Sequence, residues 1–148
     1  MKLHHIMMVV AVILLASGSS GVAPDPDDLA AGVGEVCRSL AAQMAADAEG
    51  ASRVVTLTVS GAQDHLTARR AGRAIADSAL VRAAFYGGDP NWGRLVGALG
   101  ATDVVFELDD VAVAFDGVVV ASGGVAAPFD EEALLARLAH GDFSVDVT

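Results

Sequence analysis

The pair Asp116-Gly117 stands between two apolar, β-branched runs and constrains the fold more than any other local feature. The runs are Val111–Phe115 and Val118–Ala121, so only two residues separate them. Asp-Gly at this spacing is typical of a two-residue β-hairpin, because both turn residues must tolerate positive φ. We therefore predict two antiparallel strands here, and a lone hairpin needs further strands or helices against which to bury one face.

The rest of the chain alternates between strand and helix patterns. Alternating apolar residues predict strands over 53–60, 104–108 and 143–147. Helical spacing predicts a long helix between Asp28 and Gly50, short helices carrying residues 68–75 and 80–85, and helices over 90–99 and from Asp130 to Gly141. This order favours an α/β (α+β) fold, a mixed sheet packed with helices, in one domain over residues 1–148.

Charge and cysteine content exclude several classes of protein. Nineteen acidic against nine basic residues give a net charge of −10, which disfavours nucleic acid and anionic membrane as partners. The single Cys37 cannot form an intramolecular disulfide, and its place in an apolar helical stripe predicts a core residue. His4, His5, His65 and His140 have no ligand spacing, so no metal site is predicted.

The N-terminal segment has two interpretations. Ile6–Ala16 is apolar and Ser17–Gly21 is rich in small residues. Its eleven apolar residues are too few to span a membrane, which takes about 20. The pattern fits a secretory signal peptide over 1–21, or a buried strand over 9–15 that ends in a turn.

Two segments carry candidate functional residues. Asp47-Ala48-Glu49-Gly50 places carboxylates at the end of the long helix, where the helix dipole disfavours them. An exposed last turn tolerates this arrangement. Alternatively, Glu49 leaves the helix and binds a cationic group such as the ammonium of an amino acid.

The second segment is Asp89-Pro90-Asn91-Trp92-Gly93-Arg94. Asp89 is a good N-cap and Pro90 a good first helical residue, so a helix is predicted from Pro90. Trp92 is the only tryptophan, and Arg94 in the first turn is expected to have an anionic partner. A capped helix anchored by a buried aromatic residue accounts for the pattern, and so does a binding site.

Taken together, four segments resemble one known family. The chain resembles the ornithine acetyltransferase / glutamate N-acetyltransferase family of arginine biosynthesis in four segments that occur in the family's order: Leu14–Gly21, Asp47–Ala51, Val59–Ala62 and the Asp89–Arg94 hexad. The likeness covers about 12–148, whereas residues 1–11 diverge. It implies the fold of the family's C-terminal β-chain.

The resemblance also implies an activity. Members of the family cleave themselves before a threonine, which then takes acetyl from N-acetylornithine and passes it to glutamate. Some members also use acetyl-CoA as the acetyl donor. The resemblance implies no resident cofactor. Glu49 matches the substrate-binding glutamate of the family. One wall of the site is expected to be supported by four residues of the hexad, Asp89, Asn91, Trp92 and Arg94. An α-chain-like partner is expected to complete the site.

This sequence departs from the family at its nucleophile. It contains no Gly-Thr pair, so no catalytic residue is assigned in this chain. The segment expected before Val12 and the terminal segment with further substrate-binding residues are also missing, so we expect a cytoplasmic fragment that is inactive alone. The competing hypotheses are an exported acidic binding module without catalysis and a degraded gene remnant.

Overall fold

The computed structural model describes residues 17–148, and the chain divides into two compact units, Met1–Ala48 and Glu49–Thr148. The strand expected over 9–15 lies outside the described residues. Within residues 17–148, no helix is both long enough and apolar enough to cross a membrane.

Helix α1 (Pro26–Ala46) is the main element of the first unit. Its N-cap Asp25 accepts hydrogen bonds from the backbone N–H groups of Asp27 and Asp28. The long helix is thus confirmed, but it ends at Ala46, four residues before the predicted end at Gly50. None of its residues is buried, and Cys37 is only half-buried, so the predicted core position is wrong. In the described part of this unit, residues 17–48, α1 is the only helix or strand, so its apolar stripe has no second element there to pack against.

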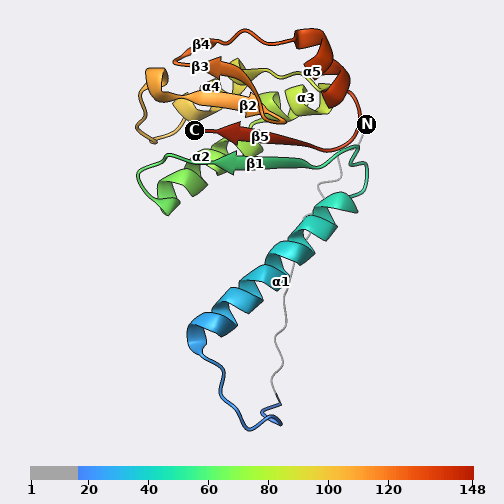
Figure 1. Ribbon diagram of the computed structural model, residues 1–148, viewed down its shortest axis with the longest axis vertical. Coiled ribbons are helices and arrows are strands. Elements are labelled where there is room, and N and C mark those ends of the chain that lie inside the picture. The colour runs from blue at the N-terminus through green and yellow to red at the C-terminus, as the bar shows by residue number, and fades with distance from the viewer. Residues whose placement is uncertain (1–16) are drawn as a thin grey trace. The chain divides into compact units, whose positions relative to one another are not determined.

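The second unit contains a five-stranded sheet in the order β1-β5-β2-β3-β4 (Figure 1). The strands are β1 (Val55–Val59), β2 (Ala112–Phe115), β3 (Val118–Ser122), β4 (Val125–Ala126) and β5 (Phe143–Val147). β1 and β5 pair in parallel and the other neighbours are antiparallel, which confirms the mixed sheet. The predicted hairpin joins β2 to β3, with φ of 47° at Asp116 and 78° at Gly117.

The strand predicted over 104–108 is wrong. Residues 104–107 have no regular structure, and Leu108–Asp110 form a short 3₁₀ helix. Both sides of β2 are already paired, with β3 and β5, so this segment finds no place beside it in the sheet. Its backbone bonds locally instead, because Val104 N–H donates to the Thr102 hydroxyl and Val105 is 92% exposed.

Four helices accompany the sheet: α2 (His65–Asp77), α3 (Ala79–Gly87), α4 (Trp92–Gly100) and α5 (Glu131–Leu138). The first three contact one another, and in Figure 1 α3 and α4 lie behind the strands. Along β5 the buried residues Phe143, Val145 and Val147 alternate with less buried Ser144 and Asp146, so one face of the sheet meets the core.

An aromatic cluster lies at the centre of this core. The Phe85 ring meets those of Phe143 and Phe115 edge to face, with centroids 5.7 and 6.3 Å apart. These rings join α3 to β5 and β2 and so fix how the helix layer sits on the sheet.

Candidate functional site

Glu49 lies outside the helix, as the functional interpretation required. It is exposed and is the first residue of the second unit, between the end of α1 and β1. No hydrogen bond or ion pair to its side chain occurs within residues 17–148. The next residue, Gly50, has φ of 78°, a value that other residues rarely adopt, so the chain turns sharply after Glu49.

A cavity of about 340 Å³ begins directly after Glu49, and we call it the arginine cavity. It is lined by residues 50–53, Val55 and Leu57 of β1, Ala76 of α2, and Arg82, Phe85 and Tyr86 of α3. Its walls are mainly apolar, and its two charged residues are both arginines. Such a space can receive part of a small molecule that carries negative charge.

Arg53, one of the residues that line this cavity, is held by several contacts. Its Nη1 donates to the carbonyl oxygen of Leu138 at 2.6 Å and its Nη2 to that of Ala139 at 3.2 Å. Its guanidinium also lies 5.8 Å from the centre of the Phe143 ring. A cation at these carbonyls stabilises the C-terminal end of α5. The buried Nε has no hydrogen-bond acceptor within residues 17–148.

The sequence analysis missed Arg53, and no local pattern would have revealed it. The hydrogen bond to Leu138 spans 85 positions in the chain. Neither helical nor strand periodicity near residue 53 contains information about a partner so distant.

The hexad forms the connection between α3 and α4, but its N-cap differs from the prediction. Asn91, not Asp89, caps α4, and its side-chain oxygen accepts from Arg94 N–H at 3.2 Å. Asp89 stays with the end of α3, because its N–H donates to the carbonyl oxygen of Ala84 at 2.9 Å. Its carboxylate accepts from Asn91 Nδ2 at 3.1 Å, so the two polar residues of the hexad hold each other.

Trp92 and Arg94 both have packing roles in this connection. Trp92 is half-buried and packs against the core. Arg94 Nη1 donates to the backbone carbonyl of Leu80 in α3 at 3.0 Å. The anionic partner expected for Arg94 is therefore wrong, because a carbonyl oxygen takes that place and no carboxylate within residues 17–148 pairs with it.

The hexad meets the arginine cavity through the residue before it. A Cβ added at Gly88, where φ is 66°, would lie 2.7 Å from the Leu138 carbonyl oxygen and 3.4 Å from Arg53 Nη1. The end of α3 thus packs directly on the backbone that Arg53 binds. Glu49 and the four hexad residues nevertheless line neither of the two cavities described here.

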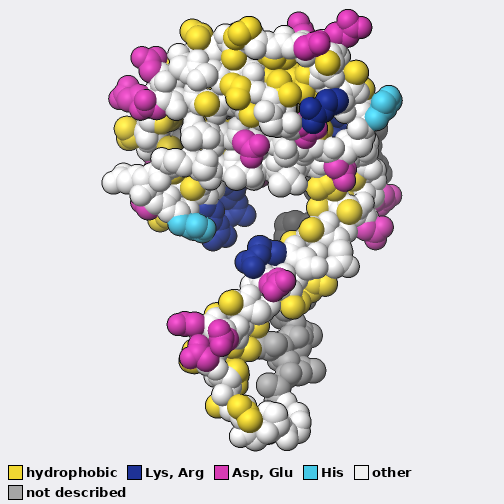
Figure 2. Space-filling model, in the orientation of Figure 1, with side chains coloured by type: hydrophobic (Ala, Val, Ile, Leu, Met, Phe, Trp, Pro, Cys, Tyr) yellow, Lys and Arg dark blue, Asp and Glu magenta, His cyan; other side chains and the backbone are white. Residues whose placement is uncertain are grey.

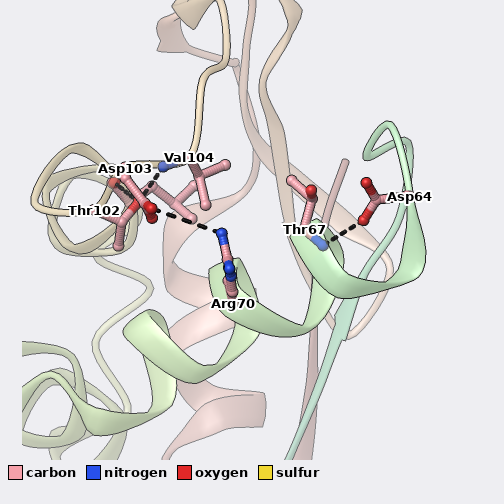
Figure 3. A network of polar contacts seen from close by, with 7 residues as sticks. Asp64, Thr67, Arg70, Thr102, Asp103 and Val104 are labelled. Atoms are coloured by element: carbon pink, nitrogen blue, oxygen red, sulfur yellow. Dashed lines mark hydrogen bonds and ion pairs between the residues drawn. The ribbon is translucent and has the colours of Figure 1, made fainter.

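A larger cavity of about 580 Å³, the strand-end cavity, lies at the carboxyl ends of β1 and β5. Ligands of open α/β sheets often bind in this position. Figure 3 shows Arg70 of α2 directed toward Asp103, with the two charged groups 3.6 Å apart. Thr67 N–H donates to the Asp64 carboxylate at 2.7 Å. This bond holds the pKa of Asp64 below its usual value, with smaller contributions from the Thr67 hydroxyl, the Leu66 N–H and the charge of Arg70.

Within residues 17–148, no group of three or more His, Cys, Asp or Glu side chains is arranged to hold a metal ion.

Comparison with known proteins supplies an independent result. The model of the ArgJ family matches residues 10–148. The arginine biosynthesis bifunctional protein ArgJ of Thermobifida fusca is 49% identical over 113 residues, which are 76% of this chain and 30% of that protein. The protein of the same name from Mycobacterium tuberculosis is 42% identical over 137 residues, 93% of this chain and 33% of that protein.

A solved structure agrees with these sequence relatives. The crystal structure of the arginine biosynthesis bifunctional protein argJ from Bacillus halodurans superposes with a TM-score of 0.79 at 30% identity, covering 90% of this chain and 67% of that one. The chain spans about a third of the length of the curated relatives.

Proposed function

The chain belongs to the ArgJ family, and we propose that it forms part of an acetyltransferase that moves acetyl from N-acetylornithine to glutamate in arginine biosynthesis. The observation that carries this proposal is the family match over residues 10–148, which contains the hexad and Glu49. The names of the bacterial relatives, which all refer to arginine biosynthesis, support it.

The reaction is expected to proceed in two steps through an acetyl-threonine ester. A threonine hydroxyl attacks the acetyl carbonyl carbon of N-acetylornithine, the amide C–N bond breaks, and ornithine leaves with the proton on its amine. The amine of glutamate then attacks the acetyl ester, the ester C–O bond breaks, and the threonine hydroxyl regains a proton. Backbone N–H groups supplied by the partner chain would stabilise each oxyanion.

In this scheme Glu49 binds the substrate. Its exposed carboxylate, which has no partner within residues 17–148, is suited to a charge-assisted hydrogen bond with an amino-acid ammonium group. The nucleophile must come from elsewhere, because none of the five threonines of this sequence follows a glycine. The chain alone is therefore expected to be inactive and to need an α-chain-like partner and further β-chain segments.

The hexad has a supporting role in the proposal. Asp89 and Asn91 bond to each other, while Arg94 and Trp92 fasten α4 to α3 and the core. These contacts keep the end of α3 in place against the segment that follows Glu49. No resident cofactor is proposed, and acetyl-CoA would serve only as an alternative acetyl donor.

The same proposal places the protein in the cytoplasm with its N-terminus intact. The family match begins at residue 10 and so includes most of the apolar run that an export signal would remove. This supports the interpretation that the run is retained in the mature protein. Intact-mass analysis of the purified protein should find Met1, and loss of about the first 21 residues would contradict this.

A chimera tests the proposed activity. The segment of the Thermobifida fusca protein that matches this chain is replaced by the corresponding residues of this chain, and acetyl transfer from N-acetylornithine to glutamate is measured. The chimera should transfer acetyl, and this chain alone should not. A folded chimera without activity, or transfer by the chain alone, would contradict the proposal.

A further inference from the structure

Positive charge is concentrated in one part of this acidic protein. Four of the nine basic residues, Arg69, Arg70, Arg73 and Arg82, belong to α2 and α3. Figure 2 shows Lys and Arg side chains gathered beside α2, whereas Asp and Glu side chains are spread over other parts of this face. A local reversal of sign within a net charge of −10 attracts anions to that place.

The arginines of the arginine cavity have no carboxylate partners. Within residues 17–148, ion pairs within 4.0 Å involve only Arg70 and Arg137, so neither Arg53 nor Arg82 takes part in one. Two acidic residues, Glu49 and Asp77, are sequence neighbours of lining residues, but neither lines the cavity itself. The acidic group bonded nearest to the lining is Asp142, whose carboxylate accepts a hydrogen bond from Val54 N–H at 2.7 Å. No carboxylate within residues 17–148 lies within 4.0 Å of the side-chain nitrogens of Arg53 or Arg82, so both guanidinium groups lack a direct ion pair.

The guanidinium of Arg53 is already fixed before any ligand arrives. Its bonds to Leu138 and Ala139 and its contact with Phe143 hold it in one orientation. Nη2 has two N–H groups and bonds to one acceptor in residues 17–148, at an exposed position. A charged donor that is ordered in the free protein loses little entropy on binding.

The rest of the lining is apolar. Val55 and Leu57 of β1 and Phe85 and Tyr86 of α3 line the same space of about 340 Å³. An inorganic anion would leave these walls wet, whereas an organic anion with an aliphatic or aromatic body would bury its apolar surface against them. The cavity is thus built for a small amphipathic anion.

We propose that the arginine cavity binds a small organic carboxylate, whose anionic end is bound by Arg82 and the free N–H of Arg53 and whose apolar body packs between β1 and α3. This site goes beyond the proposed acetyl transfer, because it uses neither Glu49 nor a nucleophile. The carboxylate site and the acetyl transfer are therefore independent, and a test of one does not decide the other.

Hexanoate is a suitable probe, titrated into the isotope-labelled chain at constant ionic strength and followed by ¹H–¹⁵N NMR. Saturable shifts should centre on residues 50–57 and 76–86. The variant Arg82→Gln should raise the dissociation constant roughly tenfold or more, the usual effect of losing a hydrogen bond to a charged group. Ala76→Glu, which adds a carboxylate to an exposed lining position, should abolish binding without disturbing the core.

Arg69→Gln is the matched control, because Arg69 is an exposed arginine of α2 that does not line the cavity. It should leave the dissociation constant unchanged. Absence of saturable shifts would overturn the proposal, as would equal binding by Arg82→Gln and the original chain. If 1-hexanol bound as tightly as hexanoate, the charge of the ligand would be irrelevant. If inorganic phosphate bound as tightly, the apolar walls would be irrelevant. Either result overturns the site as proposed.

Discussion

The Nη1 atom of Arg53 donates a 2.6 Å hydrogen bond to the carbonyl oxygen of Leu138, so the segment leading into β1 is tied to the end of α5. Both residues lie close to Gly88, where an added Cβ would be 2.7 Å from the Leu138 carbonyl oxygen and 3.4 Å from Arg53 Nη1. One arginine thus links the segment after Glu49, the end of α5 and the end of α3, from which the hexad begins.

Arg53→Ala should destabilise the second unit by about 2–4 kcal/mol, because two charged hydrogen bonds and the contact with Phe143 are lost. Urea unfolding followed by circular dichroism measures this free energy. Arg53→Lys should recover part of it. Arg73→Ala, an exposed arginine without an ion pair in residues 17–148, should change stability little, and an equal loss there would contradict the role of Arg53.

Gly88→Ala should be strongly destabilising, by about 2 kcal/mol or more, because positive φ and a backbone oxygen at 2.7 Å both oppose a Cβ. Gly97→Ala is the matched control in α4, where no atom lies within 4 Å of the added carbon. It should stabilise the helix by up to about 1 kcal/mol. Similar thermal unfolding of both variants would refute the tight packing at Gly88.

Asn91→Ala should destabilise the protein by about 1 kcal/mol, because α4 loses the acceptor that caps its first turn. Chemical unfolding gives the difference. Gln63→Ala removes an exposed amide that makes no hydrogen bond within residues 17–148 and should have almost no effect. If the two substitutions were equivalent, Asn91 would not act as the cap.

The stabilisation by Asp64 should be complete above about pH 4, the usual pKa of an unfolded aspartate, and should be lost progressively below that pH. Its folded pKa is lowered, chiefly by the bond from Thr67 N–H, so the stabilisation is present above the unfolded pKa and is lost as pH falls through the folded pKa. NMR titration of the carboxyl carbon should find this depressed pKa. The stability difference between the original chain and Asp64→Ala should shrink in acid, and a constant difference would contradict the assignment.

Glu49→Gln in the chimera should weaken substrate binding, with KM for the amino-acid substrates raised roughly tenfold or more, since a charged hydrogen bond to ammonium is lost. Steady-state kinetics of acetyl transfer test this. Asp47→Asn removes a neighbouring exposed carboxylate and should leave KM unchanged. An unchanged KM for Glu49→Gln would exclude the proposed binding role.

Local patterns predicted most elements of the second unit. The hairpin at Asp116-Gly117 was confirmed because its signal is contained in two adjacent residues with positive φ. Residues 104–108 look like a strand locally, but a strand also needs an unpaired neighbour, which no local pattern reports. The same limit applies to the cap of α4: Asp89 N–H bonds to Ala84 at the end of α3, and Asn91, not Asp89, caps the helix that begins at Trp92.

The sequence by itself determined the family and the chemical character of its candidate residues, because the hexad and the segment around Glu49 are contiguous runs whose residue types can be read directly. Only the tertiary structure decided that β5 pairs in parallel with β1, that Arg53 binds the end of α5, and that two arginines share an apolar cavity. These contacts join residues far apart in the chain. They arise from the collective packing of the sheet and its helices, which cannot be predicted from any single segment of the sequence.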